Sequence, residues 1–98
     1  MTIEIKKSVD EVIIEIDGRL DTITAPSLEA AINEYIYNTK NLILDFKKLQ
    51  YISSAGLRVL LGAQKKKQKD STMKVKNVNS EIMEVFDMTG FTDILEIE

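Results

Sequence analysis

The chain contains neither cysteine nor histidine, so two common sources of protein chemistry are missing. Without cysteine there is no disulfide and no thiolate metal site. Without histidine there is no side chain that titrates near neutral pH in its ordinary state. The glycine-rich phosphate loop GxxxxGK[ST], the dinucleotide motif GxGxxG and the nucleophile motif GxSxG are also absent. We therefore expect no enzyme, no cofactor and no bound metal.

Excess positive charge and long apolar runs are lacking too. With 13 basic and 16 acidic residues the net charge is -3, so the chain has no general positive field for nucleic acid or anionic lipid. No apolar run reaches membrane-spanning length, and the first ten residues alternate polar and apolar instead of resembling a signal peptide. We expect a cytoplasmic protein without membrane insertion or direct contact with nucleic acid, whose partner is another protein.

The spacing of the apolar residues predicts an α/β fold, with residues 1–98 forming one domain. Apolar and polar residues alternate over 3–16, which predicts a β-hairpin, and a loop is expected over 18–24. Helical spacing then predicts an amphipathic helix over 25–38, with a proline in its first turn.

The middle of the chain predicts a buried strand followed by a second helix. Leu42–Leu44 is apolar without alternation, which is typical of a central strand covered on both faces, and Asp45 closes it. The second helix is expected to begin at Ser53 or Ser54 and to end among lysines, whose charge suits the carboxyl end of a helix. Gly62 lowers the helix propensity there but permits close packing.

The last third predicts a further strand over 73–75 and a short helix within 79–90. Phe86 and Met88 are expected in the core, and Gly90 can end the helix in a left-handed conformation. Residues 94–97 are expected either to form a short terminal strand or to fold back on the core. Crossovers that contain helices imply parallel strand pairing after the hairpin, and hence a mixed sheet of four to five strands flanked by helices.

Such a sheet brings polar loops together at the carboxyl ends of its parallel strands. The 18–24 loop, Asp45 and the pair Ser53-Ser54 are expected to meet at this rim, which is the candidate site. One serine caps a helix well, but a second serine in the first turn points outward, where exposed amides and the helix dipole favour an added negative charge. Ser54 therefore suits phosphorylation.

Each of these features also has a purely structural interpretation. The two serines can serve as a helix cap alone, and Ser53 is the one expected to cap. Asp21 can simply form a turn, Asp45 can simply end a strand, and the lysine run can be a solvated helix end.

Five fragments, taken in order, resemble the STAS domain of bacterial anti-sigma factor antagonists. They are Gly18-Arg-Leu-Asp21, Thr24-Ala-Pro26, Leu42-Ile-Leu-Asp45, Tyr51-Ile-Ser-Ser-Ala-Gly-Leu57 and Phe86-Asp-Met-Thr-Gly90. The resemblance spans nearly the whole chain. It implies a STAS-type mixed sheet of four to five strands flanked by helices. It also implies that a partner anti-sigma factor phosphorylates Ser54 with ATP, although many members carry an acidic residue at the position of Ser53.

The resemblance further implies a partner-switching cycle. The unphosphorylated antagonist captures the anti-sigma factor, which is a serine kinase that binds the ATP, and is released after phosphorylation of Ser54. A PP2C-type phosphatase resets it. The expected partner-binding residues are Asp21, Thr22, Asp45, Ser53, Ser54, Ala55, Gly56 and Arg58. An alternative is a STAS adaptor or scaffold in a stress-signalling or transporter complex, without a phosphorylation switch.

Overall fold

The computed structural model describes residues 1–98 and contains five strands and three α-helices. In chain order these are β1 (Thr2–Lys7), β2 (Glu11–Leu20), α1 (Ala25–Tyr35), β3 (Asn41–Ile52), α2 (Ser54–Lys66), β4 (Thr72–Lys76), α3 (Ser80–Thr89) and β5 (Glu96–Ile97). A single 3-10 turn, η1 (Phe91–Asp93), joins α3 to β5. The predicted hairpin and helix-containing crossovers are confirmed, and of the two alternatives for the last residues the short strand is present. No helix is long and apolar enough to cross a membrane.

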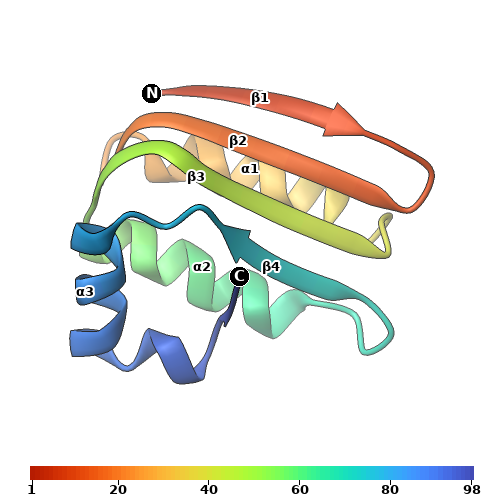
Figure 1. Ribbon diagram of the computed structural model, residues 1–98. Coiled ribbons are helices and arrows are strands. Elements are labelled where there is room, and N and C mark those ends of the chain that lie inside the picture. Colours follow the sequence, from red (N-terminus) through yellow and green to blue (C-terminus); the bar gives the residue numbers. More distant parts are fainter.

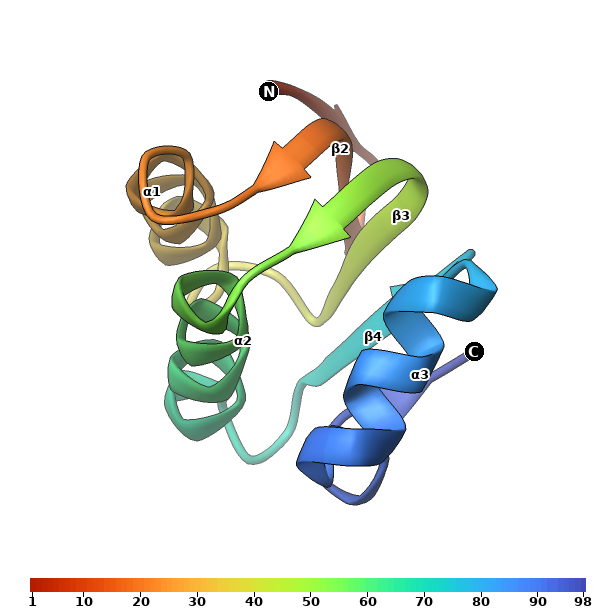
Figure 2. The same ribbon diagram turned by 90° about the vertical axis from the view of Figure 1, so that its left-hand side faces the viewer.

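The five strands form one mixed sheet in the order β1-β2-β3-β4-β5. The β1–β2 pair is antiparallel, and the three other pairs are parallel, as the helix-containing crossovers predict. Figure 1 shows the sheet with its helices beneath and behind it, and Figure 2 shows α1 and α2 side by side on one side of the sheet.

Only one face of the sheet carries the core. Ile14, Leu44 and Val75 lie in register on neighbouring strands, are fully buried and belong to one apolar cluster with residues of all three helices. Ile43 points to the opposite face because successive side chains alternate, and it lies outside that cluster. No helix of the core cluster covers this second face, so the central strand has the expected cover of a packed layer on one face alone. Ile43 is 5% exposed because its neighbours in register, which include the long side chain of Lys74, screen it.

Both central strands are longer than their sequence pattern predicts. β3 continues to Ile52 instead of closing at Asp45, and β2 continues to Leu20, so the expected loop from Gly18 is shorter than predicted. The register of the β2–β3 pair shifts twice, between Glu15 and Asp17 and between Gly18 and Arg19. Each shift interrupts the alternation by which a strand is recognised in a sequence.

The ends of α3 follow the predicted chemistry. Asn79 caps the helix, its side chain accepting from the Ile82 amide at 2.9 Å, and Gly90 follows the last turn at φ 81°. Phe86 is fully buried as expected, whereas Met88 is 80% exposed and lies outside the core. The first helix, α1, ends at Tyr35, three residues before the predicted boundary.

Gly62 does not make the close contact that was expected of it. A Cβ atom placed there would meet no heavy atom within 4 Å, although the residue lies inside α2. Glycine costs a helix interior about 0.5–1 kcal/mol relative to alanine. We therefore expect Gly62→Ala to raise the free energy of unfolding by about that amount. Urea denaturation measures this, and a loss of stability would show that the site is not open.

Candidate functional site

The candidate site is the rim where β2 and β3 end and lead into α1 and α2. Leu20 and Ile52, the last residues of these strands, are paired in register, and the Ser53 amide donates to the Leu20 carbonyl at 2.9 Å. Figure 2 looks onto this end and shows the two strand tips side by side. The 21–24 loop and the first turn of α2 therefore lie next to each other. We call these two segments the rim.

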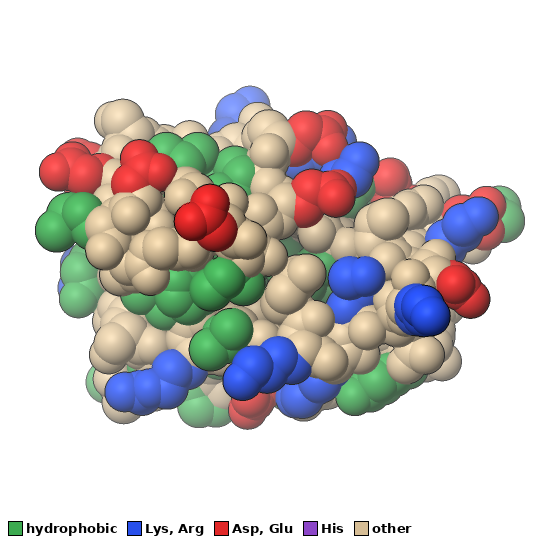
Figure 3. All heavy atoms as spheres, turned by 90° about the horizontal axis from the view of Figure 1, so that it is seen from below, with side chains coloured by type: hydrophobic (Ala, Val, Ile, Leu, Met, Phe, Trp, Pro, Cys, Tyr) green, Lys and Arg blue, Asp and Glu red, His purple; other side chains and the backbone are tan.

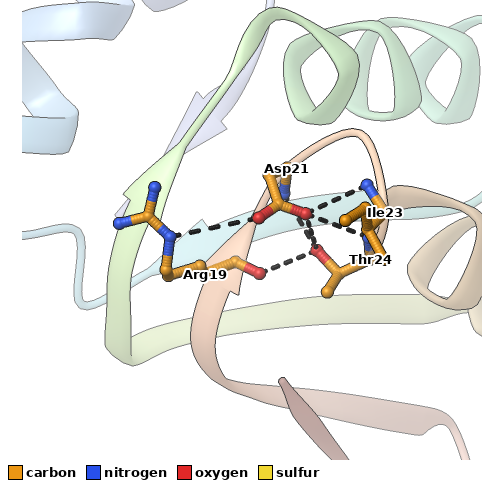
Figure 4. Close-up of polar contacts among 4 residues, drawn as sticks. All are labelled: Arg19, Asp21, Ile23 and Thr24. Carbon is orange, nitrogen blue, oxygen red and sulfur yellow. Dashed lines mark hydrogen bonds and ion pairs between the residues drawn. The ribbon is translucent and has the colours of Figure 1, made fainter.

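The 21–24 loop is held in one shape by Asp21 and Thr24 (Figure 4). Asp21 Oδ1 accepts from the amides of Ile23 and Thr24, at 3.0 and 3.1 Å. Thr24 Oγ1 accepts from the Asp21 amide at 2.9 Å and donates to the Arg19 carbonyl at 2.7 Å. The Thr24 amide, followed by the Thr24 hydroxyl, keeps the pKa of Asp21 below its usual value. Asp21 therefore makes the contacts of a turn-forming residue, as its structural interpretation predicts.

The lowered pKa of Asp21 predicts how this residue contributes to acid stability. Since the pKa is lower in the folded state, the ionised carboxylate stabilises the fold above the ordinary Asp pKa of about 3.9, and this contribution is lost as pH falls below that value. We expect the unfolding free energy of Asp21→Asn to change less between pH 5 and pH 2 than that of the unaltered chain. Urea titrations over this range provide the test, and parallel pH curves would contradict it.

Ser53 and Ser54 occupy different environments. Ser54 is exposed and is the first residue of α2, while Ser53 stands at the N-cap position with an extended backbone. The Ser53 side chain makes no capping hydrogen bond, and its Oγ is buried without a partner. The expectation that Ser53 caps the helix through its hydroxyl is therefore wrong.

The missing cap bond gives a stability prediction for Ser53. Replacing a serine that caps a helix with alanine costs about 1 kcal/mol, whereas removing an unpaired buried hydroxyl relieves a desolvation penalty. We expect Ser53→Ala to leave the stability unchanged within about 0.5 kcal/mol, or to raise it. Thermal and urea unfolding measure the difference, and a loss of about 1 kcal/mol would restore the capping role.

Gly56 fixes how α2 sits on the strand tips. A Cβ atom at this position would lie 2.7 Å from Leu20 Cγ and 2.8 Å from Ile52 Cγ1. Only glycine allows the helix to approach so closely. Two residues along a helix correspond to a rotation of about 200°, so with Gly56 against the sheet Ser54 faces away from it. This explains why the Ser54 side chain is exposed.

Most of the predicted site residues lie on the rim or the first two turns of α2. Asp21 and Thr22 are in the loop, and Ala55 and Arg58 accompany Ser54 on the helix, with Thr22 and Arg58 exposed and Ala55 partly buried. Figure 3 shows the helix side of the molecule, where most visible hydrophobic side chains lie in the left half, toward the rim.

Asp45 does not lie on the rim, contrary to the prediction. It is in the middle of β3, seven residues before Ile52, which corresponds to roughly 20 Å of extended strand. Its Oδ1 accepts from the Lys47 amide at 3.0 Å and from Asn77 Nδ2 at 2.9 Å. Since β3 continues past it, Asp45 lies within the strand, two residues after Ile43. Its side chain therefore points to the same face as Ile43, away from the core.

Two exposed side chains, one in the 21–24 loop and one at the end of β3, were not among the predicted site residues. Ile23 is 87% exposed, although Asp21 binds its amide and holds it in place. Tyr51 is 40% exposed, and the Arg19 guanidinium lies 4.1 Å from the centre of its ring. The signal for Ile23 is an apolar residue between two threonines in a loop. This end of the sheet thus exposes an apolar and an aromatic side chain to solvent.

Several known proteins resemble this chain over nearly its whole length. Residues 1–98 match the family model described as STAS domain. The chain is 32% identical to the anti-sigma-B factor antagonist of Listeria monocytogenes, over 100% of this chain and 89% of that protein. It is 31% identical to the anti-sigma F factor antagonist of Paenibacillus polymyxa, over 99% of this chain and 86% of that protein.

A solved structure shows the same fold. The crystal structure of an anti-sigma factor antagonist from Mycobacterium paratuberculosis superimposes with a TM-score of 0.91, covering 98% of this chain and 83% of that one, at 22% identity. The order of strands and helices described above is therefore also the order of a protein with little sequence identity to this chain.

Proposed function

Because the chain belongs to the STAS domain family, we propose that it is an anti-sigma factor antagonist controlled by phosphorylation. When Ser54 is unmodified, the rim binds an anti-sigma factor that is also a serine kinase. Transfer of a phosphoryl group to the Ser54 hydroxyl makes the complex dissociate, and a PP2C-type phosphatase removes the group again. The cycle takes place in the cytoplasm, and the chain itself catalyses no reaction.

The observation that carries this proposal is the exposure of Ser54. Its side chain is open to solvent at the first residue of α2, on the side of the helix opposite Gly56. A kinase needs such access, because the hydroxyl oxygen must approach the phosphoryl donor in line. The relatives named above are antagonists of anti-sigma factors, which supports the class of partner.

Phosphorylation of Ser54 would weaken binding of the partner enough to act as a switch. It adds about -1.5 to -2 charges at a place where the partner is fitted to a neutral hydroxyl, and the partner would have to desolvate that charge. A penalty of about 3–4 kcal/mol lowers affinity several hundredfold. Asp21, ionised and held in the neighbouring loop, adds a like charge on the same surface. The chain does not need to change shape.

The proposed role requires no catalytic group from this chain, which suits its composition. In phosphoryl transfer the kinase binds the nucleotide and its metal and positions the acceptor. The acceptor protein contributes one accessible hydroxyl, and the rim has one in Ser54. The absence of histidine and cysteine is no obstacle to this role.

The proposal is tested by incubating the purified chain with candidate anti-sigma kinases and ATP. Intact-mass and peptide analysis should place one phosphate on Ser54, and a binding assay on the same samples should show loss of the complex. Ser53→Ala serves as the matched control and should still be phosphorylated. A stable complex that is indifferent to phosphorylation would contradict the switch and favour an adaptor role.

A further inference from the structure

Arg58 lies on α2 four residues after Ser54, and both side chains are exposed. Residues four apart are neighbours on one face of a helix, with their Cβ atoms about 5–6 Å apart. Cα–Cβ bonds tilt toward the beginning of the helix, so the Arg58 side chain starts out in the direction of Ser54. The guanidinium group is therefore within reach of a group attached to the Ser54 oxygen.

The guanidinium of Arg58 has no partner in the unmodified protein. It takes part in none of the five ion pairs, in no side-chain hydrogen bond and in no contact with an aromatic ring. The first turn of α2 contains no acidic residue that could pair with it. Arg19, in contrast, is already engaged, with its Nε 4.0 Å from Asp21 Oδ2 and its guanidinium over the Tyr51 ring.

We propose that Arg58 binds the phosphate of phosphorylated Ser54 within the same molecule. An acidic group followed four residues later by a basic one is the favourable order on a helix. The planar guanidinium can donate two parallel hydrogen bonds to phosphate oxygens, which makes arginine better suited to this contact than lysine. The dipole of α2 favours the same negative charge at its first residue.

This ion pair deepens the proposed switch, and its occurrence in the cell rests on that proposed function. Phosphorylation then changes the rim in two ways: it adds an anion, and it withdraws the guanidinium of Arg58 from the partner. The unmodified chain presents a free cation beside a neutral hydroxyl, and the modified chain presents neither. Arg58 thus acts as a regulatory residue that helps to distinguish the two states.

The test uses the full chain with phosphoserine installed at position 54 during protein synthesis. The second pKa of the phosphate, ordinarily about 6, is measured by 31P NMR titration. A nearby cation stabilises the dianion, so Arg58→Gln should raise this pKa by about 0.2–0.4 pH unit. Arg58→Lys should give a smaller rise. The difference should shrink as ionic strength increases.

Lys65→Gln is the matched control, since it removes the same charge from an exposed position on the same helix. Lys65 lies eleven residues after Ser54, about 16 Å along the helix axis, so its replacement should move the pKa by less than about 0.1 unit. Asp21 on the rim and Arg19, which lies beside it at the end of β2, are unchanged in every variant. Equal pKa values for Arg58→Gln and Lys65→Gln would overturn the proposed pair.

The pKa titration tests the ion pair independently of the proposed function. The titration needs no kinase, because the phosphoserine is built into the chain. If no anti-sigma kinase phosphorylates Ser54, the partner switch fails, while a raised pKa in Arg58→Gln still establishes the ion pair. If the pKa values are equal, the ion pair fails, and the kinase experiment decides the switch by itself.

Discussion

Ser54→Asp is expected to bind the anti-sigma partner about tenfold to a hundredfold more weakly than the unaltered chain. One carboxylate carries about half of the charge of a phosphate, so it should cost the complex less than the several hundredfold expected of phosphorylation. Ser54→Ala should retain affinity, because the partner is fitted to a small neutral side chain. Its complex with the kinase should not dissociate when ATP is added, because position 54 then has no hydroxyl to phosphorylate. Calorimetry or surface plasmon resonance with the purified partner gives the affinities.

Ser80 provides a matched control for the charge. It is an exposed serine at the first residue of α3, so Ser80→Asp adds the same charge at the same position of another helix. Its affinity for the partner should equal that of the unaltered chain. Equal weakening by Ser54→Asp and Ser80→Asp would mean that net charge, and not the rim around Ser54, controls binding.

Gly56→Val should produce the largest loss of stability. Its Cβ alone would lie 2.7 Å from Leu20 Cγ and 2.8 Å from Ile52 Cγ1, closer than atoms pack without movement, and valine adds two methyl groups. Overpacking of this kind costs about 1–3 kcal/mol or more, and here both neighbours belong to strand tips that cannot move freely. We expect a loss of about 3 kcal/mol, and hence a fall in Tm of at least about 12 °C for a domain of this size.

Gly62→Val is the matched control for Gly56→Val. It makes the same substitution in the same helix, at a place where a Cβ meets no atom within 4 Å. Its Tm should stay within a few degrees of the unaltered chain. Equal losses at the two positions would mean that the cost comes from the helix and not from the contact with the strand tips.

The parts of the fold that could be predicted depend on local signals. Asn79 and Gly90 mark the ends of α3 because capping and the left-handed conformation are properties of single residues. The start of α2 was predicted at Ser53 or Ser54 from the same kind of signal, and the helix begins at Ser54. The exposure of Ser54 could be predicted because a second hydroxyl in a first helical turn has no structural task of its own.

The parts that could not be predicted depend on contacts between distant segments. Asp45 looks like the end of a strand in the sequence, but pairing with both β2 and β4 keeps it inside one. Ser53 has the residue type of a cap, yet its amide donates to the Leu20 carbonyl of a neighbouring strand and its hydroxyl is left unpaired. The exposure of Ile23 likewise follows from a turn whose geometry Asp21 and Thr24 determine together.

The most direct test of the central claim follows phosphorylation and binding in one sample. The complex of the chain with its anti-sigma kinase is formed without nucleotide, ATP is added, and intact mass and complex concentration are recorded over time. We predict that one phosphate accumulates on Ser54 and that the complex disappears in proportion to it. A complex that persists when Ser54 is fully phosphorylated would contradict this account.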